Sequence, residues 1–312
     1  IEATIKEEGE IVVSAKLFLD IVRRLPEEIV FIETDERMVT YIACGKVNYQ
    51  IVGMSSVEYP DLPSFEQTDR ITLNAKILRD MIRQTVYAVS ENTAKPIYTG
   101  SLYEIEDGVF KIIAIDGYRM AIRSENVDSE SKNRFVVPGK TQHEVLKLLT
   151  DDEENTEIII GQRHITFKIK NYRIISRLIE GTFIEYKSAI PKETKTEVVI
   201  NTRTIIDAVE RMSLLNNDRI QSPVRCIFSD DEIKLSCTSA VGRANDVISV
   251  PIIGESVEIG FNNRYLLDAL KNADTDEIKL ILNGSLTAMI VKPVKGDSYL
   301  SIVVPMRLAN EN

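Results

Sequence analysis

Apolar and polar positions recur along this chain in a pattern that repeats about every 60 residues. Each copy opens with alternating apolar positions, typical of a short strand, and continues with apolar positions at helical spacing. The copies begin at Ile11, Ile71, Phe135, Val198 and Ile259. One acidic residue marks the same place in every copy, at intervals of 60, 64, 63 and 61 residues: Asp20, Asp80, Glu144, Asp207 and Asp268. These matches in one register predict an internal structural repeat.

A break separates the expected strand from the expected helix in each copy. The break residue lies six positions before the acidic residue and is Ser14, Asn74, Pro138, Asn201 or Asn262. Serine and asparagine side chains accept hydrogen bonds from the free N–H groups of a first helical turn, so we expect the helices to begin there.

The roughly 40 residues between successive helices carry strand-like runs and turn signals. Expected strands include Glu157–Ile160, Ile165–Ile169, Arg173–Leu178, Ile233–Cys237, Ile278–Leu282 and Thr287–Val291. The dipeptides Asp107-Gly108 and Asn283-Gly284 are typical of hairpin turns. Each unit is therefore predicted to hold one strand, one helix and about three further strands.

The predicted fold class is α+β, with repeated strand–helix–strands units paired into domains, because one amphipathic helix on so small a sheet cannot bury its face alone. Residues before the first copy are expected to be the last strand of a further unit, which gives three domains of two units. The Pro-bearing stretches Tyr59–Gln67 and Ile190–Thr194 are the expected linkers. The predicted domains are 1–67, 68–191 and 192–312, the first lacking its N-terminal half.

Composition excludes several classes of function. The 312 residues are 44% hydrophobic and 28% charged, as in globular proteins, and no apolar run is long enough to span a membrane. The three cysteines lack metal-ligand spacing, which favours free thiols in the cytoplasm, and there are only two histidines. With no recognisable nucleophile, zinc or nucleotide motif, we expect no catalytic residue, no metal and no cofactor.

Positive charge is concentrated on the expected helices although the formal net charge is −10. Bases recur at positions about two helical turns apart, which share a face. A charged face on one helix is usually just solvated, but its repetition in five helices favours contact with duplex DNA, which Lys and Arg attract without reading sequence. The candidate DNA-facing residues are Lys16, Arg23, Lys76, Arg79, Arg83, Lys140, Lys147, Arg203, Arg264 and Lys271.

Several separate motifs resemble those of one known family. The closing string Ile302–Leu308 is similar to the C-terminal signature of bacterial DNA sliding clamps, the beta subunit of DNA polymerase III. Asp116–Met120 resembles the second-domain loop of that family, Glu258–Asn262 its third-domain entry strand, and Arg211–Phe228 the segment after its first third-domain helix. The resemblance covers the whole chain and implies a non-catalytic ring protein with helices inside and sheets outside.

The resemblance also implies a groove for short linear peptides between the second and third domains. Its expected residues are Tyr98, Ile115, Gly117, Tyr118, Arg119, Met120, Ile184, Ser188, Ala189, Ile302, Val303, Val304, Pro305, Met306, Arg307 and Leu308. Many family members have Leu, Thr, Pro, Arg and Val in place of Tyr98, Ile115, Ile184, Ser188 and Ala189. We expect Ala309–Asn312 to leave the groove open. Without the resemblance, the residues favour a terminal strand that is only sheet core, since Ile302, Val304 and Met306 would share one face.

The implied partners are double-stranded DNA, DNA polymerase III alpha and other polymerases, the clamp loader, mismatch-repair proteins and a second copy of the chain. The implied homodimer contact joins Lys46, Tyr49 and Ile51 to Leu214 and Leu215, and pairing strand edges is a sensible way to close a ring. The main alternative is an α+β repeat scaffold for protein–protein contact without DNA, which does not need basic stripes on every helix.

Overall fold

The computed structural model describes residues 2–60, 69–150, 152–216 and 222–308. The chain divides into two compact units, Ile1–Ser64 and Phe65–Asn312, called here the smaller and the larger unit. Most of the first expected linker, residues 61–67, lies outside the described residues, whereas residues 190–194 form no helix or strand.

Five α-helices occupy the places that the repeat predicts: α1 (Ala15–Val22), α2 (Ala75–Val86), α3 (Gly139–Leu148), α4 (Thr202–Ser213) and α5 (Asn263–Lys271). Each begins immediately after the break residue of its copy. Four break side chains accept a hydrogen bond from a backbone N–H of the first turn, as predicted: Ser14, Asn74, Asn201 and Asn262. Pro138 before α3 makes no such bond, because its side chain has no acceptor.

The smaller unit has one antiparallel sheet in the order β1 (Val30–Thr34), β2 (Val39–Cys44) and β3 (Val47–Val52), followed by the short helix η1 (Ser56–Glu58). Helix α1 packs on this sheet around Ile21, Ile42 and Ile51. The strands expected before the first copy and at its start are both wrong. Residues 2–10 form no strand, and from Ile11 the chain makes only the isolated bridge of Val12 to Met54 among the described residues. A strand needs a partner along its length, and this stretch has one for a single residue pair.

The larger unit contains three sheets. Two have four strands: β11 (Tyr172–Arg177), β10 (His164–Ile169), β9 (Asn155–Ile160) and β4 (Asp69–Asn74) form one, and β15 (Gly242–Ser249), β14 (Glu232–Ser239), β13 (Val224–Ser229) and β17 (Val257–Phe261) form the other. The third has nine strands in the order β16 (Ile252–Gly254), β12 (Thr196–Asn201), β18 (Glu277–Leu282), β19 (Met289–Pro293), β20 (Tyr299–Val303), β7 (Arg119–Asn126), β6 (Val109–Ile115), β5 (Gly100–Glu106) and β8 (Asn133–Pro138).

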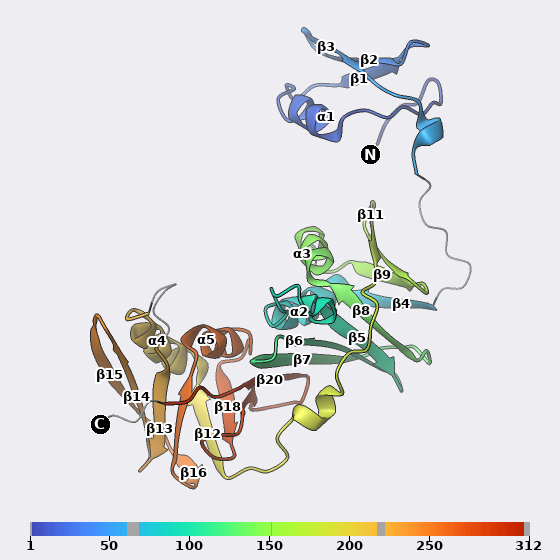
Figure 1. The fold of residues 1–312 in the computed structure, drawn as a ribbon. Helices are drawn as coiled ribbons and strands as arrows, with labels where there is room; N and C mark the ends of the chain where they lie inside the picture. The colour runs from blue at the N-terminus through green and yellow to red at the C-terminus, as the bar shows by residue number, and fades with distance from the viewer. Residues whose placement is uncertain (1, 61–68, 151, 217–221, 309–312) are drawn as a thin grey trace. The chain divides into compact units, whose positions relative to one another are not determined.

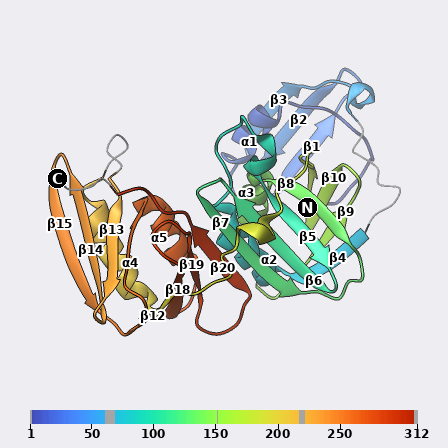
Figure 2. The same cartoon turned by 60° about the horizontal axis from the view of Figure 1, so that its bottom comes forward.

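The pairing of β7 with β20 joins the two halves of the larger unit into one sheet (Figure 2). It runs from Tyr299 opposite Arg123 to Val303 opposite Arg119. The parts that the sequence assigned to a second and a third domain therefore share a continuous hydrogen-bonded ladder, which holds them in a fixed relation along this seam.

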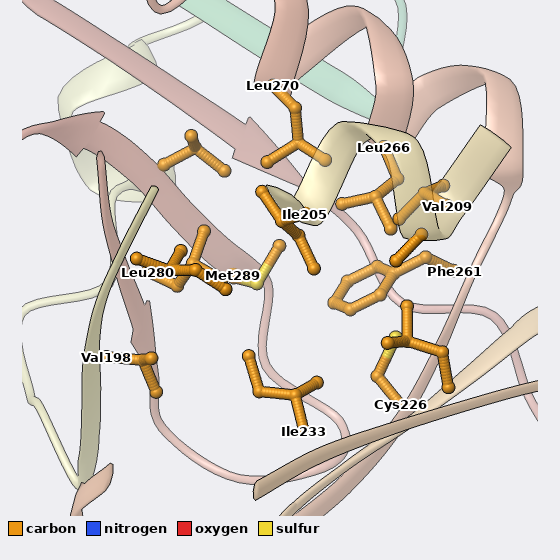
Figure 3. Packing of buried hydrophobic residues seen from close by; sticks show 14 of the residues in the cluster. Val198, Ile205, Val209, Cys226, Ile233, Phe261, Leu266, Leu270, Leu280 and Met289 are labelled. Atoms are coloured by element: carbon orange, nitrogen blue, oxygen red, sulfur yellow. The ribbon is translucent and has the colours of Figure 1, made fainter. Parts of the chain in front are cut away.

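Each half of the larger unit has a core built from two copies of the repeat. In the C-terminal half, α4 and α5 bury Ile205, Val209, Leu266 and Leu270 against Phe261 and neighbouring strand residues (Figure 3). Helices α2 and α3 do the same in the N-terminal half. This pairing confirms the α+β class. It also agrees with the interpretation that one copy of the repeat needs a second copy to cover the apolar face of its helix.

Both hairpin signals lie between paired strands, but the turns differ. Asp107 and Gly108 both have positive φ, 52° and 74°, and form the tight turn between β5 and β6 that the sequence predicted. Asn283-Gly284 lies in the connection between the antiparallel strands β18 and β19, as the hairpin signal predicted, but this connection is long, because β18 ends at Leu282 and β19 begins only at Met289. Gly284 instead supplies one left-handed residue, with φ of 99°, within a longer loop.

Candidate functional site

A depression of about 590 Å³ lies where the loop after α2, the turn between β6 and β7, and the first turn of α5 meet. Six of the predicted groove residues line it: Tyr98, Ile115, Gly117, Tyr118, Arg119 and Ile184. Tyr98 is held at the edge by an edge-to-face contact with the ring of Phe183, 5.6 Å between centroids. Aromatic walls with a few polar groups are typical of a site that binds a peptide or small ligand.

The turn at the floor of the depression is fixed by Asp116. Its Oδ1 accepts hydrogen bonds from the backbone N–H groups of Tyr118 (2.8 Å) and Arg119 (3.0 Å). Gly117 takes a φ of 96°, a left-handed conformation that residues with a Cβ rarely adopt. The sequence Asp-Gly-Tyr-Arg thus closes a rigid turn that turns the Tyr118 side chain outward and leaves that of Arg119 buried.

Arg119 is the centre of a polar network under the depression. Its Nε lies 2.9 Å from Asp116, and its Nη1 donates to Asp268 of α5. The guanidinium carbon lies 4.6 Å from the ring centre of Tyr265 and 5.4 Å from that of Tyr87. Tyr265 in turn stacks on Tyr118, with 5.7 Å between centroids and 18° between planes. An arginine that is buried and paired with carboxylates in this way has its guanidinium fixed in one orientation.

Burial and charge shift the pKa values of this network. Burial lowers the pKa of Arg119, but the carboxylates of Asp116 and Asp268 outweigh burial and hold it above its ordinary value. Burial raises the pKa of Tyr265, and the charge of Asp116 adds to the effect. Burial also raises the pKa of Tyr87 to about 12, although its hydrogen bonds to Ser301 and Tyr299 act in the opposite direction. These tyrosines therefore stay neutral at physiological pH.

The chain-end segment after β20 is attached to the same turn. The N–H of Val304 donates to the carbonyl of Tyr118 at 2.9 Å, and Met306 bridges to Gly260 at the edge strand β17. The Leu308 side chain lies close enough to Gly260 that a Cβ there would approach it to 2.5 Å. Backbone hydrogen bonds therefore fix this segment to the turn at Tyr118 and to β17 as far as Met306.

The other predicted groove residues fall into two groups. Met120, Ile302 and Val303 are buried in the sheet, with Met120 and Ile302 in an apolar cluster that Phe183 and Tyr186 cover. Their side chains are sheet core, as the residues alone allowed. Ser188 and Ala189 are exposed in the short helix η3 (Tyr186–Ala189) and do not line the depression, nor do Val304, Pro305, Met306, Arg307 and Leu308. Ala309–Asn312, expected to leave the groove open, lie outside the described residues.

Sequence reasoning missed part of the lining. The loop from Val89 to Lys95, which includes the short segment before the helix η2 (Pro96–Thr99), borders the depression, as do Asp116 and Tyr265. Arg264, predicted to face DNA, also lies there. Only the identity of Tyr265, an aromatic residue in the first turn of an otherwise aliphatic helix, gave a local signal.

Among the described residues of the larger unit, α2 packs beside α3 and α4 beside α5, and the C-terminal end of α2 meets the residues that follow α5 (Figure 1). Across the seam, Arg83 of α2 pairs with Asp274 at 2.6 Å, and Gln84 Nε2 donates to the carbonyl of Asn272 at 3.0 Å. Lys271 of α5 pairs with Glu210 of α4 at 2.6 Å. Side-chain bonds thus tie α2, α5 and α4 into one row.

Most of the predicted DNA-facing cations on this row have an acidic partner. The pairs are Arg79–Asp152 (2.6 Å), Arg83–Asp274 (2.6 Å), Lys147–Glu144 (2.8 Å), Arg203–Asp207 (2.8 Å), Arg264–Glu91 (3.4 Å) and Lys271–Glu210 (2.6 Å). Lys76 and Lys140 are exposed and have no ion pair within the described part of the chain. The row is therefore less positive than its cations alone imply.

The smaller unit holds the remaining predicted cations and one side of the predicted subunit contact. Lys16 and Arg23 are exposed, as are Lys46 and Tyr49, and β3 is an edge strand. Ile51 is buried with Ile21 and Ile42, so its side chain belongs to the core of this unit. In the larger unit, Leu214 is 82% exposed at the end of α4, and Leu215 packs against the core.

Comparison with known families matches three parts of the chain. A family model described as DNA polymerase III beta subunit, N-terminal domain, matches residues 1–63. The central-domain model matches residues 72–185, and the C-terminal-domain model matches residues 187–307. In the described residues, no helix is long and apolar enough to cross a membrane.

Individual relatives agree with the family models. The beta sliding clamp of Halalkalibacterium halodurans is 34% identical over 310 residues, 97% of this chain and 82% of that protein. A crystal structure of the Bacillus subtilis sliding clamp has a TM-score of 0.95 at 32% identity, covering 98% of this chain and 82% of that one. A sliding clamp from Pseudomonas aeruginosa bound to griselimycin has a TM-score of 0.90 at 26% identity, covering 97% and 82%.

Proposed function

The chain belongs to the family of beta sliding clamps, the beta subunit of DNA polymerase III, and from this membership we propose that it encircles duplex DNA and holds client proteins there without catalysing a reaction. The observation that supports this most strongly is the helix row, the pairs α2–α3 and α4–α5 joined by side-chain bonds across the seam, with its recurring cations. Duplex DNA presents a regular line of phosphates, which such a row can contact without reading bases.

Partial neutralisation of the row fits a protein that moves along DNA. An ion-paired Lys or Arg still attracts phosphate, but its carboxylate partner offsets much of that attraction. We infer that Lys76 and Lys140, exposed and without an ion pair within the described residues, make the strongest contacts with DNA in the larger unit. The other cations of the row contribute a weaker, salt-sensitive attraction.

Client binding is assigned to the depression beside β7. Its rings, Tyr98, Tyr118 and Tyr265, offer apolar faces, while Lys95 and Arg264 offer charge at the edge. We infer that short linear segments of DNA polymerase III alpha, other polymerases, the clamp loader and mismatch-repair proteins bind here. Griselimycin, which is bound to the Pseudomonas aeruginosa clamp, is proposed to bind at this place in the present chain.

We also propose that two copies of the chain join to close the ring. A homodimer contact would join the edge strand β3, with Lys46 and Tyr49, to the region of Leu214 and Leu215. Exposed edge strands are natural sites for such a contact. The three-domain division at 1–67, 68–191 and 192–312 and a cytoplasmic location belong to this proposal as well.

Charge reversal tests the DNA contact. The double variant Lys76→Glu, Lys140→Glu should bind linear duplex more weakly and lower the slope of log affinity against log salt by about 2, since each phosphate contact contributes about 0.9. Fluorescence anisotropy with two unrelated duplex sequences at several salt concentrations measures this. The matched control is Lys192→Glu, Lys295→Glu, two exposed lysines outside the helices.

The control also separates the clamp from a repeat scaffold that never binds DNA. The number of ion pairs on the helix row favours the scaffold as the second candidate, because paired charges stabilise a surface without any nucleic acid. Equal, small losses in both double variants would support the scaffold. Preference for one duplex sequence would contradict sequence-neutral sliding.

A further inference from the structure

The acidic residue of the repeat pairs with a base three or four residues away in four copies and with a distant base in the fifth. Asp20, Asp80, Glu144 and Asp207 each pair with a base on or directly after their own helix, at 3.7, 3.5, 2.8 and 2.8 Å. Asp268 of α5 instead pairs with Arg119 at the start of β7, 149 residues away in the chain. Arg264, four residues before Asp268, pairs with Glu91.

The pairing of Asp268 with Arg119 connects the helix row to the wall of the depression. Arg119 is only 6% exposed, so its guanidinium needs fixed partners inside the protein. Asp116 binds its Nε, and Asp268 binds its Nη1. In that position the guanidinium lies over the ring of Tyr265, whose other contact is the stacked ring of Tyr118 at the open side of the depression.

Asp116 cannot replace Asp268 in this arrangement. Its Oδ1 already accepts the two backbone N–H groups of the turn, and its Oδ2 accepts the Nε of Arg119. Without the Asp268 carboxylate, the Nη1 of Arg119 loses its charged acceptor while the rest of the side chain stays buried. An unpaired buried guanidinium nitrogen is costly, so the side chain turns toward water, and the open side nearest to it is the depression.

We propose that Asp268 is a positioning residue of the client groove, acting through Arg119 and Tyr265 to fix the Tyr118 ring, although it lies on a helix assigned to DNA. The proposal rests on the function proposed above for the depression. It predicts that the loss of one carboxylate on the helix row weakens ligand binding at a site that this carboxylate does not line.

Binding of griselimycin provides the first test. Calorimetry on the full chain should show about tenfold weaker binding for Asp268→Asn, because part of the loss of this charge-assisted hydrogen bond is transmitted to the Tyr118 ring. Asp268→Glu should restore part of the affinity, since it keeps the carboxylate. The matched control is Asp207→Asn, the same position of the repeat in α4, which should change affinity by no more than about twofold.

Hydrogen exchange without ligand provides the second test and does not depend on griselimycin. Asp268→Asn should speed exchange of the Tyr118 and Arg119 amides, whose acceptor Asp116 is held by Arg119, while Asp207→Asn should leave them unchanged. If the unaltered chain does not bind griselimycin, the proposed groove function fails, and the exchange rates still decide the role of Asp268. Wild-type exchange and wild-type affinity in Asp268→Asn overturn the inference, as do equal losses in Asp207→Asn.

Discussion

The smaller and the larger unit carry the same repeat, but they bury the apolar side chains of its helix to different degrees. At the second position after the acidic residue, Val22 of the smaller unit is 42% exposed, whereas Ile82, Val209 and Leu270 of the larger unit are fully buried. At the position before the acidic residue, Leu19 is 47% exposed and Ile206 only 7%. Equivalent apolar side chains therefore have opposite environments.

The difference shows what completes a core in this fold. In the larger unit each helix packs beside the helix of a second copy, α2 with α3 and α4 with α5, and two sheets enclose the pair. Among the described residues of the smaller unit there is one helix on one sheet. The apolar stripe of a helix sets which side chains are available for burial, and a second copy of the repeat buries more of them.

The largest expected effect is on the core positions themselves. Leu270→Ala should destabilise the larger unit by about 2–5 kcal/mol, because it leaves a cavity in a closed core. Val22→Ala, at the same position of the repeat, should change the stability of the smaller unit by less than about 0.5 kcal/mol. Urea unfolding followed by hydrogen exchange in each unit measures both. Equal losses would show that the exposed face of α1 is covered in solution.

Alkaline pH should act first on the larger unit. The pKa of Tyr87 is raised from 10.0 to about 12, so the neutral form stabilises the fold fully below pH 10, and this contribution is lost as the pH rises toward 12. At pH 11 the loss is about 1 kcal/mol. The tyrosines of the smaller unit are each at least 36% exposed. Urea midpoints of wild type and Tyr87→Phe at pH 8 and pH 11 test this, and a pH effect as large in Tyr87→Phe as in the wild type contradicts it.

Loss of a helix cap should lower stability by an intermediate amount. Asn74 accepts from Lys76 N–H at 2.9 Å and from Ile77 N–H at 3.4 Å, and its Nδ2 donates to the carbonyl of Asp152 at 2.7 Å. Asn74→Ala should therefore cost about 1–2 kcal/mol. Ser14 accepts one longer bond from Leu17 N–H, 3.5 Å, so Ser14→Ala should cost less. The midpoint of thermal unfolding ranks the two, and the reverse order would argue against the geometry.

Surface ion pairs should give the smallest effect. Glu157 lies 2.6 Å from Lys168 and 3.2 Å from Arg70, and the hydrogen bond from Lys168 lowers its pKa. Glu157→Gln should cost less than about 1 kcal/mol at pH 7. A lowered pKa means that this contribution is present above the ordinary value of 4.5 and is lost as the pH falls below it. Unfolding at pH 7 and pH 3 checks both statements, with the more exposed Asp20→Asn as the control.

Local chemistry explains why the helices could be predicted so well. A break residue such as Asn201 or Asn262 accepts hydrogen bonds from N–H groups two or three positions ahead. The start of α4 or α5 is therefore determined by neighbouring residues. The same holds for the turn at Asp107-Gly108. The wrong prediction of a strand before α1 concerns a place where the outcome depends on a distant pairing partner.

The candidate site was predictable only in part. The string Asp116–Met120 identified the turn, because its hydrogen bonds connect residues two and three apart. Tyr265 and the loop from Val89 were missed, since they reach the depression from other elements of the larger unit. The cations of the helix row were found from their spacing, but the ion pair of Arg83 with Asp274 was not, because no rule of spacing relates two residues so far apart.

The sequence by itself determined the repeat, the five helices, their polar faces and the strand content, because each of these rests on hydrogen bonds and periodicity within a few residues. The tertiary structure alone decided which apolar faces are closed, which cations are neutralised, and that Asp268 pairs with Arg119 while its four counterparts pair close to their own helices. The physical reason is that burial and ion pairing depend on which segments meet in space, and the joining of β7 to β20 brings together residues that local pattern cannot relate.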